Sequence, residues 1–247
     1  MSTGCYIYGI VNADVEVLPQ ARGVGDPPVP VEVVSRGDVG ALVSDVDVDE
    51  TLGRPEDLLA HEKLLDAVVV DTPVLPLRFG ALMTDRDAVV QKLLEPHQDE
   101  FADALSELAG RVQYAARARY FEQPLLAEIL AENATAADLA GQLRGRGADE
   151  SLDLRQQLGE IVSREVEARR QVDTEALIQA LSPVTVASAV RPPTHEEDSA
   201  HVAFLIDTAR ETEFQDAVDD IGRRWEGRAR IRLLGPMAPY DFVVTAS

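Results

Sequence analysis

Few side chains in this 247-residue sequence could carry chemistry, and they lie far apart. Cys5 is the single cysteine, and a thiol acts as a nucleophile only when a neighbouring base or cation makes its thiolate available. It lies inside a predicted strand without such a neighbour, so we expect a buried structural thiol. His61 lies on the apolar face of a predicted helix, where we expect a packed, hydrogen-bonded imidazole rather than a general base.

Metal and nucleotide sites are not indicated either. The run His195–Asp198 (His-Glu-Glu-Asp) contains metal-ligating residue types, but it lies in one polar loop with no second group at ligand spacing. The Walker pattern and the Gly-x-Gly-x-x-Gly pattern do not occur, and Pro27 and Pro28 would stop the segment after Gly25 from opening a helix. We therefore expect no catalytic residue, no metal and no cofactor.

The charge balance excludes several classes of partner. The chain has 44 acidic and 23 basic residues, a formal net charge of -21, so phosphate backbones and anionic membrane surfaces would be repelled. No signal peptide is visible, and no window approaches the roughly 20 apolar residues of a membrane-spanning helix. The single cysteine excludes an intrachain disulfide. These features predict a soluble cytoplasmic protein that binds neither nucleic acid nor membrane.

The patterning before residue 110 predicts an N-terminal α+β domain over residues 1–110. A helix is expected to begin at Pro55, where proline is tolerated, with one apolar face formed by Leu58, His61, Leu65, Val68 and Val69. The other expected elements are strands at Cys5–Val11, Val31–Val34 and Val39–Val43, an extended segment at Pro73–Phe79, and helices at Asp85–Leu94 and Asp99–Leu108.

The pattern of apolar and polar residues over 111–247 predicts a second domain. Strands are expected at Arg111–Tyr120, Val184–Val190, His201–Ile206 and Ala229–Leu234, with helices at Ser151–Leu181 and Glu211–Trp225. This βαββαβ order is that of a ferredoxin-like domain. We expect a helical insertion at about residues 121–150 and a C-terminal tail after the last strand.

Two segments are more specific than core or turn patterns. The first, residues 74–80, reads V-L-P-L-R-F-G, and it follows the helix that bears His61. The second, residues 235–243, reads G-P-M-A-P-Y-D-F-V and follows the last predicted strand. The sequence opens with Y-I-Y-G-I at residues 6–10.

Together these segments resemble the gas vesicle protein F/L family (GvpF/GvpL) along essentially the whole chain. The V-L-P-L-R-F-G match is complete, with Leu75, Pro76, Leu77, Arg78, Phe79 and Gly80. The C-terminal match keeps Gly235, Pro236, Pro239, Tyr240 and Phe242. It departs from the family pattern at Met237, Ala238 and Asp241, and the subtype, F or L, stays open.

The resemblance implies a role without catalysis. Such proteins are accessories or minor components of gas vesicles, the hollow buoyancy organelles of prokaryotes. They are thought to bind the small hydrophobic shell protein GvpA, to limit its aggregation and to support nucleation or growth of the shell. The resemblance further implies two α+β domains, the second a modified ferredoxin-like fold. Other gas vesicle accessory proteins are further expected partners.

Two questions stay open at this level. The signature residues, His61 included, are either structural, with Arg78 in an internal ion pair or bound to carbonyls, or they contact a partner. The alternative functions are a ferredoxin-like module that senses a small molecule and a hydrolase built on Cys5 or His61.

Overall fold

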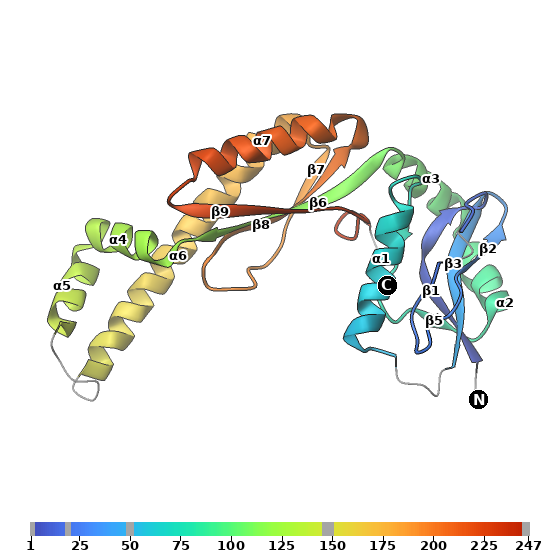
Figure 1. The fold of residues 1–247 in the computed structure, drawn as a ribbon, viewed down its shortest axis with the longest axis horizontal. Helices are drawn as coiled ribbons and strands as arrows, with labels where there is room; N and C mark the ends of the chain where they lie inside the picture. The colour runs from blue at the N-terminus through green and yellow to red at the C-terminus, as the bar shows by residue number, and fades with distance from the viewer. Residues whose placement is uncertain (1–2, 18–20, 48–51, 145–150, 244–247) are drawn as a thin grey trace. The chain divides into compact units, whose positions relative to one another are not determined.

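The protein has an α+β fold, as predicted. The computed structural model describes residues 3–17, 21–47, 52–144 and 151–243, and these ranges contain two antiparallel sheets and seven α-helices (Figure 1). Two compact units are present. The first groups Met1–Tyr114, Leu205–Ala209 and Gly235–Ser247, and the second groups Ala115–Phe204 and Arg210–Leu234.

The first unit is built on a sheet whose central strand is buried on both faces. The strand order is β2-β3-β1-β4, and β5 also pairs with β1. Figure 1 shows α1 on one side of this sheet and α2 on the other. The strands are β1 (Thr3–Asn12), β2 (Glu32–Arg36), β3 (Val39–Asp47), β4 (Leu75–Pro76) and β5 (Leu82–Met83), and the helices are α1 (Pro55–Val68), α2 (Arg86–Ala88) and α3 (Gln98–Leu108).

Helices cover both faces of this sheet, and this explains why the first strand is apolar throughout. Every residue from Gly4 to Val11 in β1 is buried, whereas a strand with one wet face would alternate. β1 pairs antiparallel with β3, with one register shift between Ile7 and Gly9. The predicted first strand and the Val-rich hairpin of β2 and β3 are therefore present.

One buried carboxylate fixes the start of α1. Asp57 accepts hydrogen bonds from the backbone N–H groups of Gly25, Gly53 and Arg54 at 2.9, 3.2 and 3.1 Å, and from the Arg54 guanidinium. Burial alone would raise the pKa of Asp57, but these donors outweigh it and hold the pKa at about 2. The carboxylate thereby joins the helix to the loop around Gly25.

Two expectations in the first unit are wrong in detail. Leu58, predicted on the buried face of α1, is 42% exposed, whereas His61 and Leu65 are buried as predicted. The helix predicted at Asp85–Leu94 changes hydrogen-bonding pattern within its length. Asp85 caps α2 through the Ala88 N–H at 2.7 Å, and a π-helical turn, η1 (Val89–Leu94), follows.

The second sheet has the strand order β7-β8-β6-β9. Its strands are β6 (Arg111–Tyr120), β7 (Ala187–Val190), β8 (Asp198–Asp207) and β9 (Ala229–Met237). The helices of the second unit are α4 (Glu122–Glu132), α5 (Ala134–Leu143), α6 (Leu152–Leu181) and α7 (Glu211–Arg224). α4 and α5 form the predicted helical insertion as far as Leu143; residues 145–150 of that insertion lie outside the described ranges.

Two contacts hold α7 and α6 on the second sheet. Phe214 of α7 packs against Phe204 of β8, with ring centroids 5.8 Å apart. Asp173 of α6 is buried, and its carboxylate accepts a bidentate pair of hydrogen bonds from Arg228 at 2.9 and 2.8 Å and one from the Tyr120 hydroxyl. A buried charge is stable only when it is paired in this way.

The strand ends differ from the predictions at two places. β7 begins at Ala187 rather than Val184, because Ser182–Val184 with its proline forms a 3₁₀ turn, η3. β9 continues through Gly235 and Pro236 to Met237, residues predicted to lie in the tail.

Each of the two compact units contains more than one stretch of the sequence, so the units differ from a single division of the chain at Gly110. The last residues of the chain, from Gly235, belong to the first unit, together with Leu205–Ala209. The predicted boundary between 1–110 and 111–247 stays a prediction. Within the described ranges, no helix is long and apolar enough to cross a membrane.

We predict that Asp57→Asn lowers the free energy of unfolding at pH 7 by about 2 kcal/mol, because an amide cannot replace a carboxylate that accepts several hydrogen bonds. The folded-state pKa is depressed from 3.8 to about 2. The stabilisation is therefore present above the unfolded-state pKa and disappears as pH falls through this window. Urea unfolding of both proteins between about pH 7 and pH 2 checks this; a difference that stays constant down to the lowest pH would contradict it.

Candidate functional site

The two signature segments meet at one buried histidine of the first unit. The Nε2 atom of His61 lies 3.1 Å from the Leu77 carbonyl oxygen, and its Nδ1 atom lies 2.9 Å from the Tyr6 hydroxyl. The Gly80 N–H donates to the same hydroxyl at 3.2 Å. The V-L-P-L-R-F-G segment is therefore tied to α1 and to β1 at two points.

These partners determine the tautomer of His61. A carbonyl oxygen can only accept, so Nε2 carries the proton and donates to Leu77, and Nδ1 accepts from Tyr6. Burial lowers the pKa of His61, although the Leu77 carbonyl opposes this shift. With both ring nitrogens engaged and the neutral form favoured, His61 is not available as a general base.

Aromatic rings surround the imidazole. His61 contacts the rings of Tyr6, Tyr8, Phe79 and Tyr240 with centroid separations of 5.8, 5.5, 5.8 and 6.3 Å. We name these five residues the aromatic cluster. Phe79 and Tyr240 come from the two signatures, so the cluster brings together segments more than 150 residues apart in the sequence.

The second tyrosine of the cluster holds the loop that precedes β2. The Tyr8 hydroxyl donates to Ser44 at 2.9 Å and accepts from the Val24 N–H at 3.0 Å. Gly23 lies so close that a Cβ atom there would be 1.7 Å from the Tyr8 oxygen. No larger side chain fits at Gly23 unless Tyr8 moves.

The C-terminal signature is attached to the first unit by its main chain. The Ala238 N–H donates to Asp66 of α1 at 2.9 Å, and the Asp241 N–H donates to Gln113 at 3.1 Å. Gly235 has φ +137°, and a Cβ atom there would lie 2.7 Å from the Tyr114 ring. Both the backbone conformation and the close approach therefore require glycine at this position.

The Tyr240 hydroxyl differs from the other hydroxyls of the aromatic cluster. It is buried, and no hydrogen-bond partner lies within reach among the described residues. Burial and the nearby Asp66 and Glu62 carboxylates raise its pKa. The ring of Tyr240 thus contributes packing, whereas its hydroxyl contributes no hydrogen bond to the described structure.

Arg78 is more exposed to solvent than the residues on either side of it. Its side chain is exposed, between the half-buried Leu77 and Phe79. In the described part of the chain, no ion pair or hydrogen bond engages its guanidinium. Arg78 thus makes no internal ion pair with a described residue, and it is presented to solvent from a segment that His61 and Tyr6 hold in place.

The remaining candidate residues are engaged in structure. Cys5 is fully buried, and burial, with the neighbouring Asp45 charge, raises the pKa of its thiol to about 11. Asp198 is buried and accepts hydrogen bonds from Arg117, Arg119, and the N–H groups of Thr194 and His195. Burial acts to raise the pKa of Asp198, but these donors outweigh it and lower the pKa. Across the described ranges, no group of three His, Cys, Asp or Glu side chains could hold a metal ion.

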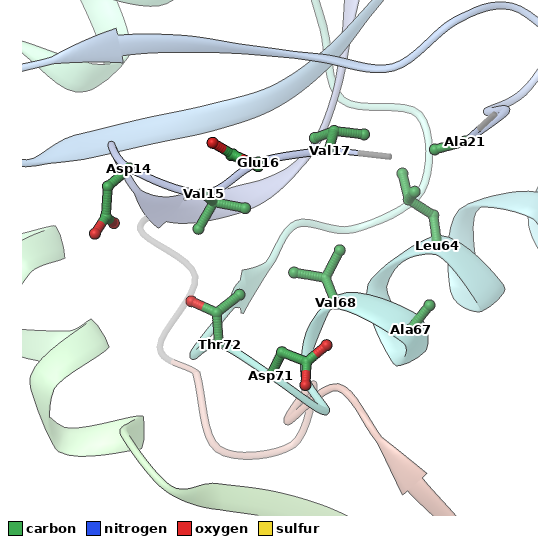
Figure 2. A pocket seen from close by; sticks show the side chains of 10 residues that line it. All are labelled: Asp14, Val15, Glu16, Val17, Ala21, Leu64, Ala67, Val68, Asp71 and Thr72. Atoms are coloured by element: carbon green, nitrogen blue, oxygen red, sulfur yellow. The ribbon is translucent and has the colours of Figure 1, made fainter. Parts of the chain in front are cut away.

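A hollow beside α1 was not predicted from the sequence. Its volume is about 340 Å³, and Val15 and Val68 are directed toward each other across it (Figure 2). The other residues that line it are Asp14, Glu16, Val17, Ala21, Leu64, Ala67, Asp71 and Thr72. The lining is thus aliphatic at its centre and carries three carboxylates, those of Asp14, Glu16 and Asp71.

A second hollow adjoins the first along the same helix. The two share Ala21, Leu64 and Ala67, and the second also contains Leu59, which is 51% exposed. Its other lining residues are Arg22, Gly23, Pro28, Glu56, Ala60 and Lys63. We name the two together the α1 groove. The only sequence signal for it was the apolar character of α1 beyond the predicted buried face.

Comparisons with known proteins place the chain among gas vesicle proteins. Residues 4–244 match the family described as gas vesicle synthesis protein GvpL/GvpF. Gas vesicle protein F of Streptomyces sp. (strain CB03234) is 33% identical over 245 residues, which cover 98% of this chain and 100% of that protein. Gas vesicle protein L of the same strain is 30% identical over 266 residues, covering 96% and 91% of the two chains.

Solved structures show the same fold. The crystal structure of GvpF from Anabaena sp. PCC7120 superposes with a TM-score of 0.79 at 23% identity, with full coverage of both chains. That of GvpF from Microcystis aeruginosa gives a TM-score of 0.75 at 23% identity, covering 97% and 98% of the two chains.

We predict that Tyr6→Phe and Tyr240→Phe differ in their effect on stability. Tyr6→Phe removes the donor to His61 and the acceptor for Gly80, and should lower the free energy of unfolding by about 1–2 kcal/mol. Tyr240→Phe removes a buried hydroxyl that has no partner in the described structure, so its effect should lie within about 0.5 kcal/mol of zero or be stabilising. Chemical denaturation of both variants measures the difference; equal losses would contradict the hydrogen-bond assignment.

Proposed function

Since the chain belongs to the family of gas vesicle synthesis proteins GvpL/GvpF, we propose that it binds the hydrophobic shell protein GvpA, limits its aggregation, and supports vesicle nucleation or growth. In this proposal it acts in the cytoplasm, in association with the gas vesicle, and other accessory proteins of the vesicle are further partners. Its role is to bind proteins rather than to catalyse a reaction.

The observation that carries the proposal is the α1 groove. Aliphatic side chains in a concave surface are the feature by which a protein retains an apolar segment of a partner. The groove lies on a helix that Asp57, His61 and Asp66 fix through hydrogen bonds. A helix fixed in this way loses little conformational entropy when a partner binds against it, which favours binding.

The charge distribution supports a solubilising role. The first unit has 23 acidic residues and eight basic ones, and the second has 21 and 15. A complex that carries an excess of negative charge repels other complexes of the same kind. An apolar partner bound to such a protein would therefore be kept from associating with further copies of itself.

The proposal assigns different roles to the signature residues. His61, Leu77, Phe79, Gly80, Gly235 and Tyr240 act as architecture that fixes α1 and the ends of the two segments, together with Leu75, Pro76, Pro236, Pro239 and Phe242. Arg78 acts as a partner contact. We also infer that the second unit is a modified ferredoxin-like domain; the element order β6-α-β7-β8-α7-β9 and the strand order β7-β8-β6-β9 support this.

A small-molecule sensor is the second candidate function. The first hollow of the α1 groove, about 340 Å³, lies in the size range of ligand sites. A thermal shift with a metabolite that Val68→Phe abolishes would favour this function over GvpA binding. Absence of any shift across a metabolite panel would remove it.

We predict that Leu59→Glu and Ala67→Glu each reduce GvpA binding at least tenfold, because each adds a charge to the aliphatic lining of the α1 groove. Both side chains are exposed, so the variants should fold. Co-purification with GvpA, and the amount of GvpA that stays in the supernatant on co-expression, measure the effect.

The matched control is Val172→Glu, which introduces the same charge at a 65% exposed valine of α6. It should bind GvpA as the wild type does. Equal loss of binding in all three variants would indicate a general charge effect and contradict the groove assignment. Normal vesicles after deletion of the gene from a vesicle-forming host without a paralogue, together with no GvpA binding, would refute the proposed function itself.

We further predict that Arg78→Ala leaves the free energy of unfolding within about 0.5 kcal/mol of the wild type, as expected for an exposed, unpaired side chain. It should nonetheless weaken GvpA binding. Denaturation and co-purification of the same preparation separate the two effects; a destabilised variant with normal binding would make Arg78 a structural residue.

A further inference from the structure

Four arginines gather on one face of two neighbouring strands in the second unit. The Phe121 N–H donates to the Arg228 carbonyl at 3.0 Å, which sets the antiparallel register of β6 and β9. The closeness of Gly235 to Tyr114 at the other end of the pair fits the same register. Arg119 is then opposite Arg230, and Arg117 is opposite Arg232, all on the sheet face away from the buried Tyr120 and Ala229.

The two arginines of β6 share one counter-charge. The Asp198 carboxylate accepts hydrogen bonds from Arg117 Nε at 3.1 Å and from Arg119 Nε at 3.0 Å. The side chain of Arg119 nevertheless stays 43% exposed. A single carboxylate therefore serves both guanidinium groups of this strand.

The two arginines of β9 have no counter-charge in the described ranges. Arg230 lies over the Phe121 ring, 5.8 Å from its centroid, and Arg232 makes no ion pair or hydrogen bond with a described residue. Both side chains are exposed. Like charges directly opposite each other on paired strands are destabilising, and they are unexpected in a chain with 44 acidic and 23 basic residues. The arrangement therefore fits an anionic partner.

The strand that carries these side chains also has an open edge. β9 is the last strand in the order β7-β8-β6-β9. Because Phe121 and Arg228 form a hydrogen-bonded pair, Arg230 and Arg232 turn their main-chain groups toward β6, whereas Ile231 and Leu233 turn theirs outward. Of the outward N–H groups, that of Ala229 is taken by the Trp225 carbonyl at 2.9 Å. No residue of the described ranges takes the groups of Ile231 and Leu233, so they are available to another strand.

We propose that β9 binds an extended acidic segment of a partner protein by strand addition. The segment has acidic residues at two alternate positions, which lie opposite Arg230 and Arg232, and an apolar residue two positions further on, opposite Leu234. Leu234 is 45% exposed on the same face. Alternate side chains share one face of a strand, so the spacing of charges in the partner is part of the recognition. This site lies in the second unit and does not depend on GvpA binding to the α1 groove.

An alternative explanation is that the arginines protect the open edge of β9 against pairing with strands of other chains. Charged side chains on an edge strand discourage pairing with other chains. This explanation accounts for charge on β9, but it does not account for the cross-strand pairing with Arg117 and Arg119. It also predicts that no strand binds, whereas our proposal predicts selective binding.

The experiment uses the full-length protein and two fluorescent ten-residue peptides of identical composition. In the first, two glutamates are two positions apart in a background of threonine and valine; in the second, they are adjacent. Fluorescence anisotropy should show at least tenfold tighter binding of the first peptide, because adjacent glutamates point to opposite faces of a strand. Methylation of the peptide amides that would face Ile231 and Leu233 should also weaken binding at least tenfold.

The protein variants provide the matched controls. Arg230→Gln combined with Arg232→Gln should weaken binding of the first peptide at least tenfold, and circular dichroism should show an unchanged fold. Arg223→Gln combined with Arg224→Gln makes the same change in net charge on α7 and should leave binding unchanged.

Four results would overturn the proposal. The first is no binding of either peptide, which would favour edge protection. The second is equal binding of the two peptides, and the third is equal loss in the two double variants; both would indicate attraction by charge alone. The fourth is tighter binding of an oligothymidylate than of the first peptide, which would make the face a nucleic-acid site.

Discussion

A buried imidazole needs one acceptor and one donor around it, and the first unit meets this need with two segments distant in sequence. The Leu77 carbonyl accepts from His61, and the Tyr6 hydroxyl donates to it. The helix, the central strand and the signature segment are thereby held in one geometry. These two hydrogen bonds tie β1 and the segment that carries Arg78 and Phe79 to α1, the helix that lines the α1 groove.

Sequence patterns predicted much of this architecture. β6 has the predicted bounds, and α1 begins at the predicted proline. The family resemblance singled out His61 and both signature segments, but it did not show that they are in contact. Periodicity could not show that Tyr240 reaches His61, because side-chain patterns record which face is buried and not which distant segment buries it.

Other features left no trace in the sequence for physical reasons. The exposure of Arg78 depends on how its neighbours turn the backbone, and an arginine between two apolar residues is equally compatible with an internal ion pair. The π-helical turn at Val89–Leu94 has the residue types of an ordinary α-helix. The α1 groove arises between segments that each look ordinary, and the pairing of arginines across β6 and β9 requires a register that composition does not contain.

The two units differ in the surfaces that they offer. The first combines an aliphatic groove with a strong excess of carboxylates, whereas the second has a smaller excess, 21 acidic residues against 15 basic ones, and an arginine-bearing edge. An apolar partner and an acidic partner could therefore be bound by different parts of one chain.

The residues from Gly235 to Val243 complete the unit that the chain begins with. During synthesis, β1 and α1 leave the ribosome long before Tyr240, the last ring of the aromatic cluster, and before the Ala238 N–H that binds Asp66. The first unit cannot reach its final packing until the residues after Gly235 have been synthesised, unlike a domain whose residues are continuous in the sequence. Nascent chains would thus expose part of this core to chaperones while the second unit is being synthesised.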